Sequence, residues 1–119
     1  MNKQQWADNL FKSIDAMDTD KFCDFFTDNA KFKFGNAETV EGKEQIRQMV
    51  SGFFASIKGL SHTVSDMVEQ DSALVCRGEV TYTRKDSSEL TVPFSNYYKL
   101  NGDKVSDYQI YVDASQLYS

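Results

Sequence analysis

The chain has 119 residues, which is enough for one domain but not for two separate hydrophobic cores. Nine Phe, six Tyr and one Trp give it more aromatic side chains than a disordered segment carries. The net charge of −5 argues against a surface that neutralises phosphates, so we expect no nucleic-acid partner. No apolar run approaches the ~20 residues that cross a bilayer, and the first ten residues lack the apolar stretch of a signal peptide. We therefore expect a cytoplasmic protein with no membrane partner.

Cysteine and histidine are too few for a disulfide framework or a metal centre. Cys23 and Cys76 lie far apart, with no CxxC pair and no cluster of histidines near either. We predict that both are small buried apolar residues. His62 is the only histidine, so the sequence predicts no metal site of the usual kind, and we expect no cofactor.

The first third of the chain predicts two helices and a short strand. Residues 3 to 17 place Trp6, Leu10 and Ile14 on one apolar stripe of a helix. Thr19 is a suitable N-cap for a short second helix that carries several Phe residues. Residues 30 to 34 alternate, with Phe32 and Phe34 on one face, which predicts a strand with one buried face. We expect residues 35 to 39 to form a loop.

The rest of the chain predicts one more helix and then four strands. Apolar residues recur with a period of 3.6 from about residue 43 to 58, and we expect Gly59 to end this helix in the left-handed conformation. The period then changes to two, over residues 61–70, 73–84, 89–100 and 104–113. The connections are short and include Asn101-Gly102, a strong hairpin signal, so neighbouring strands are antiparallel. The pattern predicts an α+β domain, with three N-terminal helices on one face of a curved antiparallel sheet.

Three segments carry a resemblance to a known superfamily: DTDKFCDFFTDNAKFKF, VEGKEQIRQMV and NYYKLNGDKVSDYQIYVDASQLY. Together with the order of the elements, they resemble the nuclear transport factor 2-like superfamily, and most of all its SnoaL-like (polyketide cyclase-like) small proteins. The resemblance covers nearly the whole chain and implies a single cone-shaped domain with an internal pocket. It also implies a homodimer through the sheet. It implies no single chemistry, because function depends on the site and not on the fold.

Strand alternation divides the sheet residues into an apolar set and a mixed set, and the sequence leaves open which set faces the pocket. The apolar set is Leu74, Cys76, Val80, Tyr82, Leu90, Val92, Phe94, Tyr98, Tyr108, Ile110 and Val112. The mixed set is Val75, Arg77, Glu79, Thr81, Thr91, Pro93, Ser95, Tyr97, Gln109, Tyr111 and Asp113. A positional resemblance to an enzyme family of the same fold favours the mixed set.

That enzyme family is the limonene epoxide hydrolases, which use an acid–arginine–acid group to add water to an epoxide. The positions that match in this chain are Arg77, Glu79 and Asp113, which the resemblance implies as catalytic residues. Residues 77 and 79 leave the same face of a strand, and an arginine between two acids can keep one of them ionised. Phe32 and Phe34 stand where those enzymes position a water molecule, and neither can hold one.

Each of these residues also has a purely structural interpretation. Arg77 and Glu79 would then form a cross-strand ion pair, and Asp113 would cap the turn that follows it. If Asp113 is catalytic, an Asp113→Asn substitution abolishes turnover and changes the melting temperature little.

Further side chains are candidates for binding an apolar small molecule, the partner that the resemblance implies. Phe32, Phe34, Phe54 and Trp6 would form an apolar wall, and Ser95, Tyr97 and Tyr111 would donate hydrogen bonds to a ligand oxygen. His62 is either a base in the pocket or a surface residue.

Three functions therefore stay open. The first is an enzyme that performs acid–base or water-assisted chemistry on an apolar substrate. The second is a non-catalytic module that binds an apolar ligand. The third is a dimeric interaction domain whose pocket is filled by its own side chains.

Overall fold

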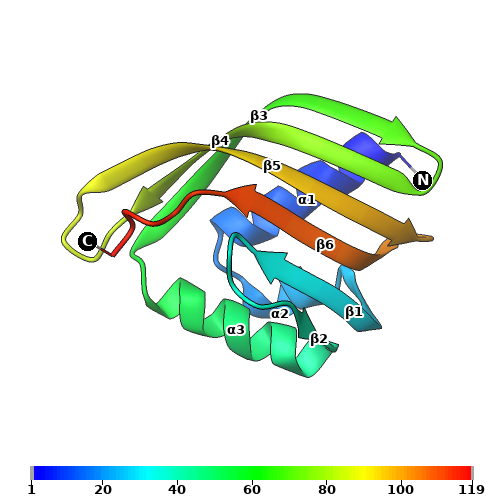
Figure 1. Ribbon diagram of the computed structural model, residues 1–119, viewed down its shortest axis with the longest axis horizontal. Coiled ribbons are helices and arrows are strands. Elements are labelled where there is room, and N and C mark those ends of the chain that lie inside the picture. Colours follow the sequence, from blue (N-terminus) through cyan, green and yellow to red (C-terminus); the bar gives the residue numbers. More distant parts are fainter. Residues whose placement is uncertain (1, 119) are drawn as a thin grey trace.

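The computed structural model describes residues 2–118, which form three helices and one six-stranded sheet (Figure 1). The helices are α1 (Lys3–Asp15), α2 (Thr19–Cys23) and α3 (Lys43–Ala55). The strands are β1 (Phe26–Phe34), β2 (Val40–Glu41), β3 (Gly59–Gln70), β4 (Ala73–Thr83), β5 (Glu89–Asn101) and β6 (Lys104–Val112). This α+β architecture confirms the predicted fold class.

The sheet order is β2-β1-β6-β5-β4-β3. Strands β3 to β6 follow one another as an antiparallel meander, as their short connections require. Strand β1 pairs with β6 in parallel, with Phe32 beside Tyr108, and this pair brings the first strand of the chain next to the last. Parallel neighbours need a long crossover, and most of the chain between β1 and β6 provides it.

Both N-terminal helices begin with a side-chain cap. The side chain of Asn2 accepts a hydrogen bond from the backbone N–H of Gln5 at 3.0 Å, and the Asp18 side chain accepts one from Lys21 at 3.1 Å. The N-cap of α2 is therefore Asp18, and the expected cap, Thr19, is its first helical residue.

Gly78 allows strands β3 and β4 to approach closely at the point where the sheet bends. The register between these strands shifts between Val64 and Asp66, a β-bulge that increases the local twist. A Cβ atom built on Gly78 would lie 1.9 Å from the backbone oxygen of Thr63. Only glycine fits there, and the bend helps the sheet to curve around the helices.

The hydrophobic core lies between the concave face of the sheet and the helices (Figure 1). Leu10 and Ala7 of α1 and Ile46 of α3 are completely buried against inward side chains of the sheet, which include Leu74 and Tyr98. Cys23 and Cys76 are free and buried in this core, as predicted. The concave face of the sheet is therefore the apolar one, and the mixed set faces outward.

Most element boundaries agree with the predicted ones, and the differences have local causes. Helix α3 ends at Ala55 with Ser56 as its C-cap, so the prediction that Gly59 ends the helix is wrong, and Gly59 begins β3. The Ser56 hydroxyl donates a 2.6 Å hydrogen bond to the backbone oxygen of Phe53 at this helix end. The residues predicted as a loop are followed by the short strand β2, which pairs with β1.

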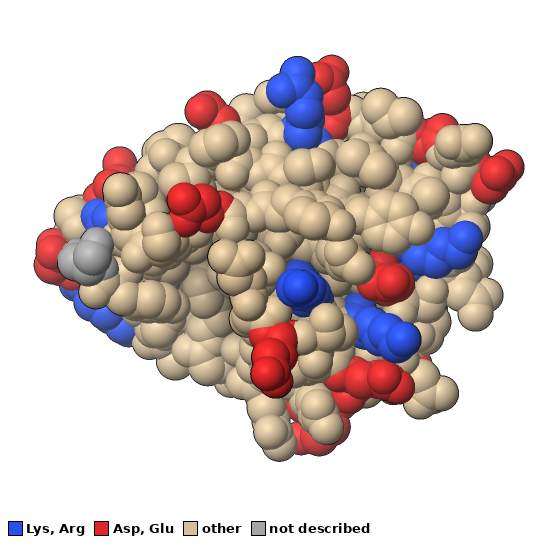
Figure 2. All heavy atoms as spheres, viewed as in Figure 1, with Lys and Arg blue, Asp and Glu red and all other residues tan. Residues whose placement is uncertain are grey.

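Positive and negative side chains alternate over the face seen in Figure 2, without a large area of one sign. A band over β5 and β6 carries few charges in this view. Val75 and Tyr111 are exposed on the outer sheet face through which we expect the homodimer to form, and sedimentation of the purified chain would test that expectation. Among the described residues no helix is both long and apolar enough to span a membrane.

Candidate functional site

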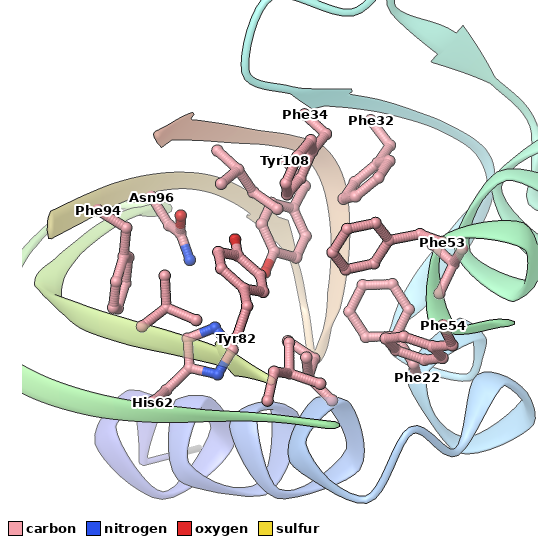
Figure 3. Close-up of a pocket in the computed structure, with 15 residues that line it drawn as sticks. Phe22, Phe32, Phe34, Phe53, Phe54, His62, Tyr82, Phe94, Asn96 and Tyr108 are labelled. Atoms are coloured by element: carbon pink, nitrogen blue, oxygen red, sulfur yellow. The ribbon is translucent and has the colours of Figure 1, made fainter. Parts of the chain in front are cut away.

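A cavity of about 50 Å³ lies inside the cone, between the concave sheet face and the helices (Figure 3). We call it the inner cavity. Its walls are mainly aromatic and aliphatic. His62 contributes an imidazole to the wall, and Asn96 contributes an amide. The lining residues used below are Phe22, Phe32, Phe34, Phe53, Phe54, His62, Tyr82, Phe94, Asn96 and Tyr108.

His62 reaches the inner cavity from β3 and is held by Asp15, the last residue of α1. The Nδ1 atom of the imidazole lies 2.6 Å from Oδ1 of Asp15, and the backbone N–H of His62 donates to Oδ2 at 3.2 Å. A carboxylate can only accept hydrogen bonds, so Nδ1 carries the ring proton. The other nitrogen, Nε2, then has a free lone pair.

The surroundings of this pair differ for its two members. The His62 side chain is only 10% exposed and packs against the rings of Phe11 and Phe94, with centroid distances of 4.9 and 5.3 Å. The Asp15 side chain is 31% exposed. One member thus faces an apolar interior while the other reaches solvent, through which a proton can be exchanged. Within the described part of the chain, Nε2 has no hydrogen-bond partner among the protein atoms.

A chain of three buried polar side chains follows the concave face next to His62. Nδ2 of Asn96 donates to the hydroxyl of Tyr98 at 3.0 Å, and that hydroxyl lies 3.4 Å from the hydroxyl of Tyr108, to which it donates. Burial raises the pKa of Tyr98 and of Tyr108 well above the usual range, so both phenols stay protonated. Among the described residues, Oδ1 of Asn96 is the only buried side-chain nitrogen or oxygen atom without a hydrogen-bond partner.

Aromatic side chains close one side of the inner cavity (Figure 3). The rings of Phe34 and Phe53 lie 5.2 Å apart, and both residues are only partly buried. An apolar cavity of about 150 Å³ admits benzene, and one of about 10–15 Å³ already holds a water molecule. At about 50 Å³ the inner cavity has room for one or a few small groups, and a larger ligand requires Phe34 and Phe53 to move outward.

The outer face of the sheet holds the residues that the hydrolase resemblance singled out. Arg77, Ser95, Tyr111 and Asp113 line an open hollow on that face. The structure thus brings these four together, but on the side of the sheet away from the inner cavity. Of the two faces that the sequence left open, the apolar set lines the inner cavity, because it has the helices to pack against, and the mixed set that the resemblance favoured does not.

Within that hollow, each charged side chain has a local partner. The guanidinium of Arg77 binds the carboxylate of Asp66 through Nε and Nη2, both at 2.8 Å. Oδ1 of Asp113 accepts a hydrogen bond from the backbone N–H of Ser115 at 3.0 Å, the turn-capping role given above as the structural interpretation. Hydrogen bonds from Ser115 lower the pKa of Asp113. Asp113 is exposed, so nothing shields a substrate from water there.

The other predicted residues divide between the two faces. Phe32, Phe34 and Phe54 lie at the wall of the inner cavity, whereas Glu79 is exposed and Tyr97 half-buried on the outer face. Trp6 lies outside the cavity wall. Its ring packs edge-on against Phe25 and Tyr98, and its Nε1–H donates to the backbone oxygen of Asp103 at 2.8 Å, which fastens α1 to the β5–β6 turn.

Sequence reasoning missed two polar residues of the inner site, although each left a signal. Asn96 is the one amide in a run of apolar inward positions that includes Phe94 and Tyr98. Asp15 follows Phe11 by four residues, which places it on the buried side of α1.

Comparison with known proteins now identifies the family. The family model described as SnoaL-like domain matches residues 7–108. The chain belongs to the SnoaL-like domain family. No curated protein matches the chain.

Solved structures of SnoaL-like and NTF2-like proteins share the fold at low sequence identity. An NTF2-like protein of unknown function from Burkholderia pseudomallei superposes with a TM-score of 0.88 at 10% identity, over 100% of this chain and 99% of that one. A putative SnoaL-like polyketide cyclase from a Jannaschia species gives 0.80 at 17% identity, covering 94% and 85%. A protein of ketosteroid isomerase-like fold from Catenulispora acidiphila, in complex with trimethylamine, gives 0.86 at 14% identity, covering 94% and 88%. These likenesses establish the fold.

Proposed function

We propose that this SnoaL-like protein binds a compact, largely apolar, oxygen-bearing carbon compound in the inner cavity and transfers a proton on it through His62. The observation that carries the proposal is the His62–Asp15 pair, which leaves Nε2 unpartnered at the wall of an apolar cavity. A carboxylate that fixes the tautomer of a histidine and stabilises its protonated form makes that histidine an effective general base. That a Jannaschia relative is described as a polyketide cyclase supports a carbon-rich, carbonyl-containing substrate class.

The proposed chemistry is the removal of a proton from a carbon next to a carbonyl group. Nε2 of His62 takes the proton, and the C–H electron pair forms a carbon–carbon double bond while the carbonyl electrons move onto oxygen. The hydroxyl of Tyr108 accepts from Tyr98 and keeps its own proton to donate to that oxygen. Asp15 stabilises the imidazolium until the proton returns to carbon or is exchanged with solvent.

The same arrangement supports a second, non-catalytic candidate, because the inner cavity is small. About 50 Å³ is little more than packing defects leave in a well-packed core, so the cone would then be filled by its own side chains. His62 and Asp15 would serve to fasten α1 to β3, and the chain would act as a binding or interaction domain.

Exchange of carbon-bound hydrogen for deuterium separates these candidates without knowledge of the natural substrate. Acetone, hydroxyacetone and cyclopentanone are incubated in D₂O with the protein, and loss of the proton signals next to the carbonyl is followed by NMR. We expect saturable acceleration with at least one of them. An interaction domain with a filled cavity would give only the background rate with all three.

His62→Asn is the decisive variant. The amide nitrogen of asparagine can occupy the place of Nδ1 and donate to Asp15, while the base at Nε2 is lost. Loss of a general base lowers the rate by ~10²–10⁴-fold. An unchanged exchange rate in a variant with native circular dichroism would contradict the proposal.

Asp113→Asn tests the outer hollow in the same assay. Its carboxylate lies outside the inner cavity, so we expect exchange at the wild-type rate. Loss of exchange in this variant, with His62→Asn active, would move the chemistry to the outer face.

A further inference from the structure

The buried amide of Asn96 has an unfilled acceptor. Asn96 is 2% exposed, and its Oδ1 has no hydrogen-bond partner, although its Nδ2 is bonded to Tyr98. Side-chain oxygens buried in this way are nearly always satisfied, so such an exception needs an explanation. Asn96 lines the inner cavity, and Figure 3 shows its amide between Phe94 and Tyr82, on the side of the cavity across from the His62 backbone.

The direction of the neighbouring hydrogen bonds determines what can bind there. Asn96 donates to Tyr98, and Tyr98 donates to Tyr108. Oδ1 of Asn96 at one end of this chain can therefore accept a hydrogen bond from a ligand, and the hydroxyl of Tyr108 at the other end can donate one. The two ends offer a ligand one acceptor and one donor. A substrate with a hydroxyl beside its reacting carbonyl uses both, because the hydroxyl donates to Oδ1 of Asn96 while the carbonyl oxygen accepts from Tyr108.

The ligand group that fills this position is neutral. Among the described cavity-lining residues there is no carboxylate, and Asp15 behind the wall is engaged with His62. A cation in such apolar surroundings would lose its hydration without an opposite charge. A ketone or ether oxygen would face Oδ1 with no hydrogen to share. A ligand hydroxyl supplies the hydrogen that Oδ1 lacks.

We infer that Asn96 selects ligands that carry a hydroxyl group, and that its Oδ1 accepts the hydrogen bond of this group. The inference rests on the proposed function, whose substrate it narrows to compact hydroxylated compounds, in particular those with a hydroxyl beside the reacting carbonyl. Asn96 is a specificity-determining residue in this scheme, and His62 remains the base.

Cyclopentanol and cyclopentanone provide the test, because they share ring size and heavy-atom count and differ in whether the oxygen can donate. Each is titrated into ¹⁵N-labelled wild-type protein. The backbone amide signals of Phe94 and Tyr108, which line the cavity, report binding in the wild type and in the variants alike. We expect cyclopentanol to bind more tightly by ~10-fold or more, since an unmatched buried polar group discriminates strongly between such ligands. Equal affinities, or a preference for the ketone, would overturn the inference.

Asn96→Leu tests whether this residue causes the preference. Leucine keeps the branched shape and removes the acceptor, so the affinity ratio of alcohol to ketone should fall close to one. Asn29→Leu, the same change at an exposed position of β1, should leave the ratio as in the wild type. A ratio that survives in Asn96→Leu would overturn the assignment.

The outcome is independent of catalysis. A preference for cyclopentanol without any hydrogen exchange would refute the proposed proton transfer and leave the hydroxyl subsite standing. Exchange that depends on His62, together with equal binding of alcohol and ketone, would do the reverse.

Discussion

Replacing Asn96 by leucine should make the protein more stable. Oδ1 of Asn96 is buried without a partner, which costs about 1–3 kcal/mol of folding free energy. The substitution removes that cost and also removes the hydrogen bond from Nδ2 to Tyr98, which contributes about 0.5–1.5 kcal/mol. Tyr98 keeps Tyr108 as a hydrogen-bond partner, so no new buried group is left unpaired. The balance lies between roughly −0.5 and 2.5 kcal/mol, and its central value is a gain of about 1 kcal/mol.

The expected shift in melting temperature follows from the length of the chain. For 119 residues, an unfolding entropy of about 2.1 cal/mol/K per residue gives roughly 250 cal/mol/K. A gain of about 1 kcal/mol therefore raises Tm by about 4 °C. Differential scanning calorimetry measures this shift, and urea unfolding gives the free energy independently.

Asn29→Leu is the control for a general effect of exchanging asparagine for leucine, because exposed substitutions usually change stability by less than about 0.5 kcal/mol. A fall in Tm of several degrees in Asn96→Leu, with the control unchanged, would refute the reasoning. It would mean that the amide oxygen is well satisfied in the folded protein and needs no ligand hydroxyl.

Two further predictions concern the sheet and its buried phenols. Gly78→Ala should destabilise the fold by about 1–3 kcal/mol or more, because the added Cβ would lie 1.9 Å from the backbone oxygen of Thr63. A Tm that calorimetry finds unchanged would contradict the close approach of β3 and β4. Burial raises the pKa of Tyr82 to about 12, while an unfolded tyrosine titrates near 10. Above pH 10 the unfolded chain therefore binds fewer protons than the folded one, and the free energy of unfolding should fall as the pH rises from 10 towards 12. Urea midpoints that stay constant over this range would show that Tyr82 is not shielded from water.

The meander and helices were predictable because their signals are local. Alternation with period two and the Asn101-Gly102 turn place β4, β5 and β6 within one or two residues of their observed bounds. The β1–β6 pair was not predictable in this way, because Phe32 and Tyr108 meet across most of the chain and no local pattern encodes that contact. The end of α3 was misplaced because glycine is common both after helices and in bends of strands.

The sequence left open which face of the sheet lines the cavity, and the resemblance to the hydrolases favoured the outward face. The positional match to another enzyme family favoured placing Arg77 and Asp113 in the pocket. The simpler argument is that eleven apolar side chains on one face must be buried against other elements. The three predicted helices supply that cover on the concave side. The pairing of His62 with Asp15 joins residues 47 apart in sequence, and only the crossing of α1 over β3 brings them together.

His62 and Asn96 stand out because they bring an imidazole and an amide to a cavity wall that is otherwise aromatic and aliphatic. Aromatic and aliphatic side chains would fill the positions of His62 and Asn96 at less risk to stability, since an unmatched buried polar group is costly. A fold usually departs from consistent core packing where function requires it. These two polar residues lie together. His62 packs against the ring of Phe94, Asn96 follows Phe94 by two residues on β5, and both line the inner cavity. Polar residues retained only by chance would be scattered through the core. The charged residues of the outer hollow carry no such cost, because they are exposed and paired locally. The grouping is therefore the reason to place the chemistry inside the cone.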